Sequence, residues 1–312
     1  MQDQTTPKYT SRRFSDDPGF RPYDKRQLSY AHTFDSPAKQ ATIRALEWAT
    51  GKLTLLRRIR RFENSEKVTG QAFWPKALDS MGIDVHTPPE QVARIPATGP
   101  LVVVSNHPHG MVDGIILADL IGRVRTDYKV LTRSLISNIE EVAGFMIPVP
   151  FQHEEDSLGK GLEMRREAMA VLARGGVIIL FPAGAVASSD GWFGRAVEKE
   201  WNPFTAKMIQ KSGASVLPVY FPGQNSRAYQ IACHLSPTLR QGLLVHEVAH
   251  ALDRPQTPVI GQPIPFDEMR LFADNPRGFM EWLRARTLAL GGKSQSPAFP
   301  AGQRAGTGLS PR

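Results

Sequence analysis

Short apolar runs alternate with longer segments of helical spacing between about residues 100 and 262. The runs are rich in valine, isoleucine and aromatic residues, and they cover residues 101–104, 128–132, 146–151, 177–181 and 215–221. The helical segments between them include residues 114–121, 157–174 and 203–212. Because strands that alternate with helices form βαβ units, the pattern predicts an α/β fold with a largely parallel central sheet flanked by helices.

An amphipathic stripe at residues 38–62 precedes this region and predicts a helix. Its apolar positions recur at steps of three and four residues and are Ile43, Leu46, Ala49, Leu53, Leu56 and Ile59. Basic residues fill many of the other positions: Arg44, Lys52, Arg57, Arg58, Arg60 and Arg61. Such a helix packs on the domain with its arginines in solvent, or it lies on an anionic membrane surface, where each base contributes on the order of 1 kcal/mol. The two interpretations are compatible.

The two ends of the chain are polar and lack helical or strand periodicity. We predict a disordered arm over residues 1–36, a helical and basic N-terminal segment over 38–94, an α/β domain over 95–290 and a disordered tail over 291–312. With 41% hydrophobic and 22% charged residues, the 312-residue chain has the composition of a globular protein.

The formal net charge of +8 favours anionic ligands or surfaces. Nucleic acid is not an expected partner, because the arginines gather in one amphipathic segment without an aromatic platform. The single cysteine, Cys233, permits no disulfide within the chain and suits a reducing compartment. The first residues show no apolar signal segment, and no run reaches the roughly 20 apolar residues that span a bilayer. We expect a cytoplasmic protein that lies peripherally on the inner face of the membrane.

Three of the predicted strands end in turns of unusual composition. Asn106 and His107 follow the first strand, a Phe-Pro-Ala-Gly turn at residues 181–184 follows the fourth, and a Gly-Gln-Asn-Ser turn at residues 223–226 follows the fifth. In parallel α/β sheets, ligands bind beyond the carboxyl ends of the strands. We therefore predict that the three turns share one rim and form a binding site.

His107 and Asp113 form the candidate catalytic pair at this rim. A tight Pro/Gly turn lets an aspartate in the first turn of the next helix reach an imidazole at the end of the strand. A neutral imidazole is matched to the removal of a proton from a hydroxyl near pH 7, and a carboxylate on its other nitrogen fixes its tautomer. His109 also lies within four residues of Asp113, so the choice between the two histidines stays open on spacing alone.

The three turns resemble the sequence boxes of the glycerolipid and lysophospholipid acyltransferase family, which has an NH-x4-D box, an FPEG-like box and a V-x-P strand. Here these are Asn106-His107 with Asp113, Phe181-Pro182-Ala183-Gly184 and Val216-Leu217-Pro218. The resemblance is nearest to the haemolysin-like bacterial branch, with its NHP-x-G-x-x-DG box. The string at residues 107–110 also looks like the HPHG box of the diacylglycerol acyltransferase type.

The resemblance implies an enzyme that moves a fatty acyl group from acyl-CoA or acyl-carrier protein to a hydroxyl of a lysophospholipid or lyso-aminolipid. It favours His107 as general base, oriented by Asp113 and supported by Asn106, His109 and Gly110. Substrate contacts are expected at Phe181, Pro182, Gly184, Pro218 and Asn225. No metal and no cofactor beyond the acyl-thioester co-substrate is implied, and the absence of a G-x-S-x-G elbow signals no acyl-enzyme serine.

One departure from the family concerns the FPEG-like box. Its usual acid is absent, because position 183 is Ala and position 185 is Ala. This puts ordinary glycerol-phosphate recognition in doubt. Arg133, after the second strand, and Arg195 are candidates to hold a phosphate or carboxylate through a bidentate contact.

Two other functions compete with acyl transfer. Residues 246–250 fit the H-E-x-x-H pattern of zinc metallopeptidases, with His246 and His250 as ligands, Glu247 as base and Glu268 as a third ligand. The helical pattern at residues 239–251 is short for such a site and is followed by a strand-like segment at 258–261. A non-catalytic membrane-binding protein is the other alternative, based on the altered box and the basic helix.

Overall fold

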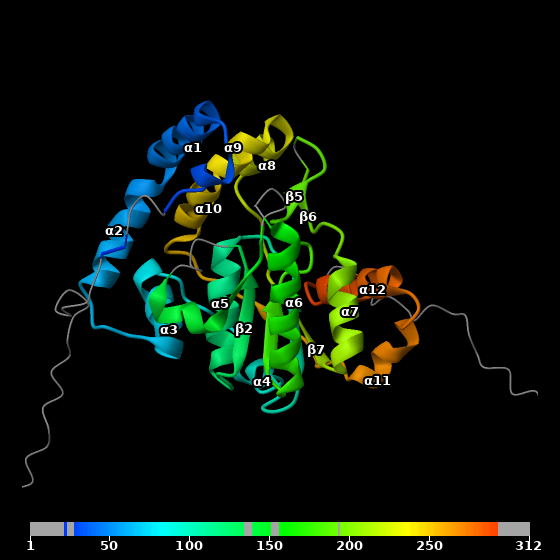
Figure 1. Ribbon diagram of the computed structural model, residues 1–312. Helices are drawn as coiled ribbons and strands as arrows, with labels where there is room; N and C mark the ends of the chain where they lie inside the picture. The colour runs from blue at the N-terminus through cyan, green and yellow to red at the C-terminus, as the bar shows by residue number, and fades with distance from the viewer. Residues whose placement is uncertain (1–21, 24–27, 134–138, 151–155, 193, 293–312) are drawn as a thin grey trace, which may run out of the picture.

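The computed structural model describes residues 22–23, 28–133, 139–150, 156–192 and 194–292 (Figure 1). Within them, the central sheet has the strand order β3-β2-β4-β1-β7-β8. These strands are β3 (Met146–Pro148), β2 (Tyr128–Thr132), β4 (Val177–Leu180), β1 (Leu101–Ser105), β7 (Ser215–Tyr220) and β8 (Val259–Ile260). All neighbouring pairs are parallel except β7 and β8. The predicted α/β fold with a largely parallel sheet is confirmed.

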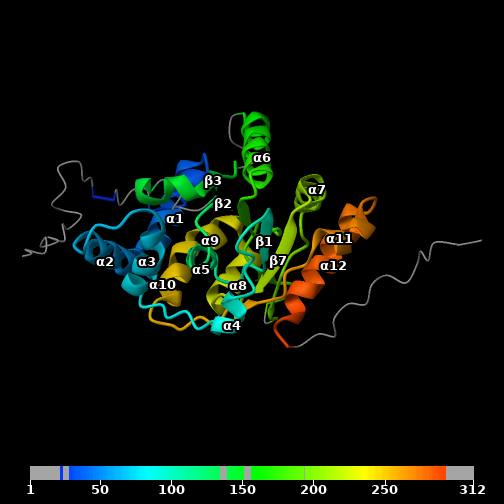
Figure 2. The same ribbon diagram turned by 90° about the horizontal axis from the view of Figure 1, so that it is seen from below.

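Helices cover both faces of the sheet (Figure 2). Leu101 and Val103 of β1 belong to one apolar cluster, while Val102 and Val104 belong to the other, and all four are fully buried. The first cluster includes residues of α2 (Lys52–Glu63), α3 (Phe73–Met81), α5 (Met111–Gly122) and α10 (Leu244–Ala251). The second includes residues of α6 (Ser157–Ala173), α7 (Pro203–Ser212), α11 (Phe266–Met269) and α12 (Pro276–Ala289). Burial on both sides explains why the strands are continuous apolar runs.

The predicted amphipathic helix at residues 38–62 is two helices, α1 (Pro37–Thr50) and α2, which meet at Gly51. A Cβ on Gly51 would lie 2.9 Å from the Cβ of Ala249 in α10, so the missing side chain permits close packing there. The break separates the apolar stripe into two. Ile43 and Leu56 are buried, whereas Leu53, which a single helix would turn inward, is half exposed.

The basic residues of this segment fall into two groups, two that are paired with acidic residues and four that are exposed. Lys52 is buried against the fully buried Glu47, with 3.7 Å between Nζ and Oε2, and Arg58 pairs with Asp253. The other four basic residues are exposed: Arg44, Arg57, Arg60 and Arg61. The segment is therefore basic on its outer face and packs on the domain through its inner face.

The start of the packed domain lies earlier than the sequence predicted. Residues 28–36, assigned to the polar arm, include the 3₁₀ turn Ala31–Thr33, and Leu28, Tyr30 and Ala31 are buried. The Tyr30 amide donates to Glu47 Oε1 at 2.7 Å, which ties this segment to α1. Residues 1–21, 24–27 and 293–312 of the predicted arm and tail lie outside the described residues.

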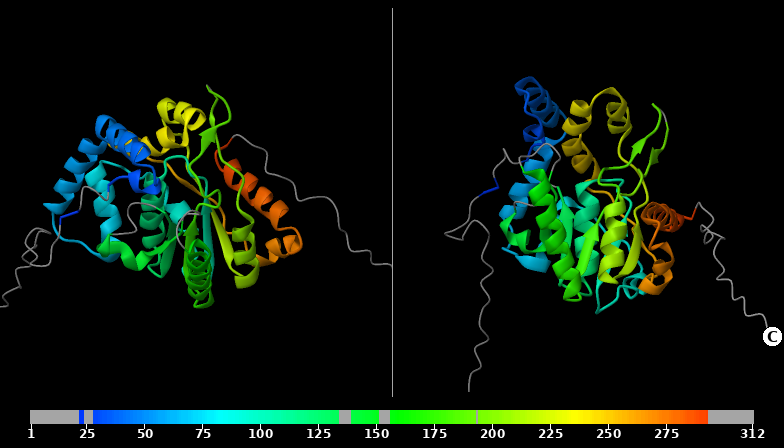
Figure 3. Two further views of the ribbon diagram at one scale, coloured as in Figure 1. Left: turned by 45° about the horizontal axis from the view of Figure 1, so that its top comes forward. Right: turned by 45° about the vertical axis from the view of Figure 1, so that its right-hand side comes forward.

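Several smaller elements complete the described fold. Helices α8 (Arg227–Leu235) and α9 (Pro237–Gly242) and the hairpin of β5 (Ser188–Ser189) and β6 (Ala196–Val197) lie beyond the carboxyl ends of the strands (Figure 3). Helix α9 packs on α1, and the hairpin lies beside α8. The single helix predicted at 239–251 is thus α9 followed by α10. The remaining elements are α4 (Pro89–Val92) and the 3₁₀ turns Gly70–Ala72, Glu140–Phe145 and Arg270–Phe272. Among the described residues, no helix combines the length and apolar character needed to cross a bilayer.

Candidate active site

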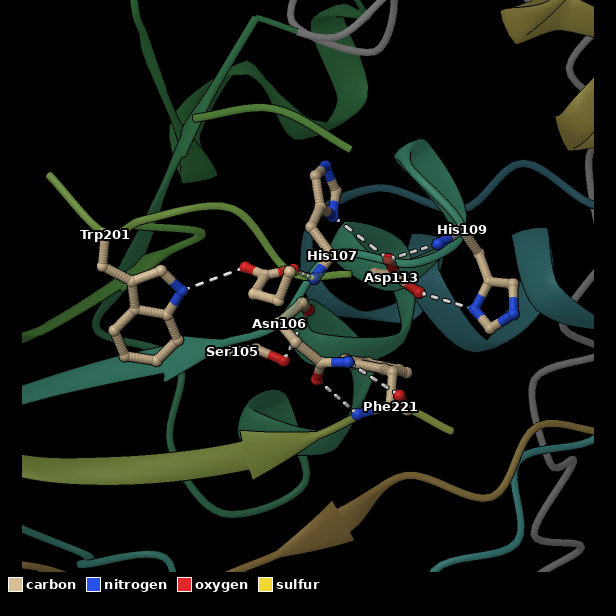
Figure 4. Close-up of polar contacts among 8 residues, drawn as sticks. Ser105, Asn106, His107, His109, Asp113, Trp201 and Phe221 are labelled. Carbon is tan, nitrogen blue, oxygen red and sulfur yellow. Dashed lines mark hydrogen bonds and ion pairs between the residues drawn. The ribbon is translucent and has the colours of Figure 1, made fainter. Parts of the chain in front are cut away.

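The turn between β1 and α5 carries the candidate catalytic residues. Gly110 adopts φ +67°, which a residue with a side chain rarely adopts, and it caps α5 so that Asp113 lies in the first turn of the helix. Asn106 binds the end of β7 through both side-chain atoms. Its Oδ1 accepts from the Phe221 amide at 2.7 Å, and its Nδ2 donates to the Phe221 carbonyl at 2.8 Å (Figure 4). The turn is therefore fixed to the neighbouring strand.

One carboxylate serves both histidines of the turn. His107 Nδ1 lies 3.1 Å from Asp113 Oδ2, and His109 Nδ1 lies 3.1 Å from Asp113 Oδ1 (Figure 4). The His109 amide also donates to Asp113 Oδ2 at 2.9 Å. An ionised carboxylate only accepts hydrogen bonds, so both Nδ1 atoms carry a proton. Nε2 of neutral His107 then keeps its lone pair.

The electrostatics of this group follow from burial and mutual contact. Burial alone would raise the pKa of fully buried Asp113, but the hydrogen bonds from His107 and His109 outweigh it and hold the pKa below its ordinary value. Burial acts to lower the pKa of His109, yet the hydrogen bond and charge of Asp113 leave it raised. The Asp113 carboxyl group is therefore ionised at neutral pH and can accept hydrogen bonds from both imidazoles.

The raised pKa of His109 predicts a pH-dependent stability. Folded His109 binds its proton more tightly than the unfolded chain, so its stabilising contribution is complete below about pH 6.5 and is lost as the pH rises through the folded-state pKa. Urea unfolding at several pH values above about 6.5 should show that the free energy of unfolding of the wild type falls as the pH rises. The fall should be smaller in His109→Gln. Equal slopes in the two proteins would contradict the assignment.

The imidazole of His107 lies against a second turn of the rim. It stacks on Phe181 with 3.8 Å between ring centroids and 23° between planes. Phe181 directly follows β4, which pairs with β1, so the sheet itself sets this contact. The backbone of His107 is also bound. Its amide donates to Glu198 Oε2 at 3.1 Å, and its carbonyl accepts from the Ala187 amide at 2.9 Å.

A cavity of about 1100 Å³ opens at His107 and His109. Part of its wall comes from β2, α6 and α7 and is largely apolar, including Leu131, Leu158, Met164 and Phe204, with Arg133 and Arg165. Another part comes from the N-terminal segment, α9 and α10 and is more polar, including Lys39, Arg240 and Glu247. A long apolar chain and a polar group can thus both be accommodated beside the imidazoles.

Comparison with known proteins identifies the kind of site. A protein-family model described as acyltransferase matches residues 68–246, more than half of the chain. The chain belongs to the acyltransferase family. This confirms the family predicted from the sequence boxes, and the matched region contains all three turns of the rim.

Two curated relatives and one solved structure are similar to this acyltransferase. A lyso-glycine lipid O-acyltransferase from Phocaeicola vulgatus is 26% identical over 212 residues, covering 65% of this chain and 72% of the relative. A lyso-glycine lipid O-acyltransferase from Bacteroides thetaiotaomicron is 30% identical over 148 residues, covering 46% of this chain and 51% of the relative. The 1-acyl-sn-glycerophosphate acyltransferase PlsC from Thermotoga maritima is 16% identical with a TM-score of 0.41, covering 85% of this chain and 89% of that one.

The acyltransferase cavity gathers some of the predicted substrate-binding residues. Those that line it are Phe181, Pro182, Gly184, Arg133 and Asn225. Asn225 is 4% exposed, and its Nδ2 is a buried donor without a partner among the described residues. A buried amide that lacks a partner is costly unless a ligand or water satisfies it. Asn225 Nδ2 is therefore a candidate hydrogen-bond donor to a bound ligand.

Two of the predicted substrate contacts, Arg195 and Pro218, are not among the residues that line the cavity. Arg195 is exposed in the turn between β5 and β6. Pro218 is buried within β7, where it pairs with Val104 and its carbonyl accepts from the Gly261 amide at 2.9 Å. Its role in the described structure is to pack the sheet, because a strand residue two positions before the strand end cannot reach the rim.

The altered box leaves the cavity without an acid at that turn. Ala185 lines the cavity, and Ala183 packs against the core. Among the described lining residues, the acidic side chains are Asp35 and Glu247. Glu247 accepts from the Ser226 amide at 2.8 Å and from Ser226 Oγ at 2.6 Å, so it also secures the turn that carries Asn225.

The same contacts bear on the metallopeptidase alternative. His246 Nδ1 lies 2.9 Å from the Thr50 carbonyl, and His250 Nε2 accepts from Arg254 Nη1 at 2.9 Å. Glu268, the third ligand suggested by the sequence, lies beside Arg286, with 3.4 Å between Nη1 and Oε2. No cluster of three metal-ligating side chains is found among the residues that the structure describes. The H-E-x-x-H segment gains no support as a zinc site and instead packs α10 on α1 and the Ser226 turn.

Proposed function

We propose that this acyltransferase transfers a fatty acyl group from an acyl thioester to the hydroxyl of a lysolipid, with His107 as general base and Asp113 as its orienting carboxylate. The observation that carries the proposal is that His107 lies on the wall of a large, partly apolar cavity while its Nδ1 is 3.1 Å from the buried Asp113 carboxylate. Nε2 of His107 would take the proton as the hydroxyl oxygen attacks the thioester carbon. The C–S bond then breaks, and the departing thiolate receives that proton from the imidazolium.

The acceptor class that we infer is a lyso-aminolipid rather than a lysophosphatidic acid. Two curated relatives carry the name lyso-glycine lipid O-acyltransferase. The cavity wall includes cationic Lys39, Arg240, Arg133 and Arg165, which suit an acceptor carboxylate or an anionic donor. Loss of the box acid at Ala183 and Ala185 agrees with a departure from glycerol-phosphate recognition.

An acceptor and donor panel tests this proposal. Purified protein would be given acyl-CoA or acyl-carrier protein with a lyso-glycine lipid or a lysophosphatidic acid, and products would be identified by mass spectrometry. We expect the ester of the glycine lipid to form faster than phosphatidic acid. Faster acylation of lysophosphatidic acid would contradict the acceptor assignment, and the donor that supports turnover would identify the thioester.

Membrane contact through the basic N-terminal segment is part of the same proposal. Trp48 is 51% and Leu53 is 47% exposed, and Arg57, Arg60 and Arg61 are exposed on α2. Exposed apolar side chains beside arginines suit the surface of an anionic leaflet, and we propose that the protein is cytoplasmic and lies peripherally on the inner face of the membrane.

Vesicle flotation measures this contact. Changing Arg57, Arg60 and Arg61 to Glu should reduce binding to vesicles with anionic lipid by at least about tenfold, given on the order of 1 kcal/mol for each base. A matched triple variant, Arg174, Arg270 and Arg277 to Glu, makes the same charge change on other exposed arginines and should retain more binding. Equal loss in both triple variants would remove α2 from the account.

A further inference from the structure

Glu198 is a buried carboxylate that contacts the candidate catalytic turn from outside the cavity. It directly follows β6 and is 5% exposed. Its Oε2 accepts from the His107 amide at 3.1 Å, and its Oε1 accepts from Trp201 Nε1 at 3.0 Å; the indole contact is drawn in Figure 4. Burial raises the pKa of this carboxyl, although the hydrogen bonds from Trp201 and His107 offset part of the effect. Each carboxylate oxygen of Glu198 thus accepts one hydrogen bond.

The position of His107 explains why its backbone needs such a partner. The parallel ladders of β1 end at Val104 with Leu180 and at Ser105 with Val219. His107 lies two residues beyond the ladder, where the neighbouring strands offer its amide no acceptor. A buried amide must find another partner or pay for lost hydration. Glu198 supplies it, and the Ala187 amide occupies the His107 carbonyl.

Glu198 is itself anchored to other parts of the domain. Trp201 is 5% exposed and belongs to the apolar cluster that includes residues of α6, α7 and α12. The carbonyl of Glu198 accepts a hydrogen bond from Arg284 Nη2 of α12. Because both anchors belong to the opposite face of the sheet from α5, the carboxylate connects that face to the turn that bears His107.

We infer that Glu198 is a positioning residue for the acyl transfer, fixing the backbone of His107 so that its ring meets Asp113 and Phe181 together. This inference rests on the proposed role of His107. Glu198 is not among the residues that line the cavity, so it acts through His107 and not through the substrate. A carboxylate outside the cavity wall thus secures the turn from inside the domain.

The test separates turnover from binding. A misplacement of about 1 Å in a reacting group can cost on the order of 100-fold in rate, so Glu198→Ala should lower kcat by about 10- to 100-fold with KM changed less than about twofold. Trp201→Phe removes the other hydrogen bond of the carboxylate and is the matched control. It should keep kcat within about threefold, because the bond to the His107 amide remains.

A conservative variant keeps the test valid if Glu198→Ala does not fold. In Glu198→Gln, the amide oxygen can accept from His107 only when the amide NH₂ faces the Trp201 N–H, which places two donors together. Glu198→Gln combined with Trp201→Phe relieves this conflict, so the double variant should recover at least about half of the kcat lost in Glu198→Gln alone.

The outcomes separate this inference from the proposed function. An unchanged kcat in Glu198→Ala, a rise in KM that accounts for the loss, or a double variant no better than Glu198→Gln would overturn the positioning role. His107→Gln is assayed in parallel. If that variant keeps full activity, the proposed base is wrong, whatever the Glu198 variants show. If His107→Gln is inactive but Glu198→Ala is fully active, only the positioning role of Glu198 is wrong.

Discussion

His107→Gln is expected to lower kcat by about 100- to 10,000-fold, the range that a positioned general base contributes. Glutamine is close in size to histidine and can still contact Asp113, but it cannot accept the proton of an attacking hydroxyl. The cavity should survive, so KM and the melting temperature should change little. Steady-state acyl transfer followed by mass spectrometry, with thermal unfolding of each variant, measures both effects.

The matched control is His109→Gln, because His109 contacts the same carboxylate at the same 3.1 Å distance. Its ring does not stack on Phe181, and its pKa is raised by Asp113, so it is less available as a base. We expect a smaller loss of kcat than in His107→Gln. A greater loss in His109→Gln would reverse the roles of the two histidines.

Asp113→Asn is expected to lower kcat by about 1,000- to 10,000-fold, as in other His–Asp pairs where the carboxylate fixes the imidazole tautomer. The carboxylate accepts three hydrogen bonds here, two from imidazoles and one from the His109 amide. An asparagine has one acceptor oxygen, so its NH₂ group must face one of these donors or force an imidazole into the other tautomer. The loss should be in kcat with little change in KM.

Asp119→Asn is a suitable control, because Asp119 is also a buried aspartate of α5 but pairs with Arg123. It should keep kcat near that of the wild type even if stability falls. Wild-type turnover in Asp113→Asn would show that the carboxylate does not orient the base.

The free energy of unfolding of the wild type should also decline at low pH. The pKa of Asp113 is lowered in the folded protein, so its stabilising contribution is lost as the pH falls through that pKa.

The strands and the three turns were predictable because burial on both faces leaves a clear apolar signal. The runs at 101–104 and 177–181 correspond to β1 and β4, and the turns that follow them meet at one rim. Their closeness depends on the order β4-β1-β7, which no local pattern reveals. The His107–Asp113 pair was predictable because both residues lie in one turn, where spacing alone limits the geometry.

Other features depended on contacts that are distant in the sequence. The break at Gly51 arises from the approach of α10, almost 200 residues later, and a glycine inside a helical pattern does not by itself announce a break. Glu198 reaches His107 because the β5–β6 hairpin returns the chain to the turn. No motif marks Glu198. Pro218 lies within β7 and does not line the cavity, and a sequence box does not show which of its residues face the sheet.

Free thiol release, measured with and without an acceptor, shows whether His107 catalyses direct transfer of the acyl group to a hydroxyl. Purified protein would be mixed with acyl-CoA or acyl-carrier protein, with or without a lyso-glycine lipid, and thiol and ester would be quantified together. The account predicts one ester for each thiol, negligible release without acceptor, and loss of both products in His107→Gln. Thiol release that is equally fast without acceptor, or ester formation that persists in His107→Gln, would contradict it.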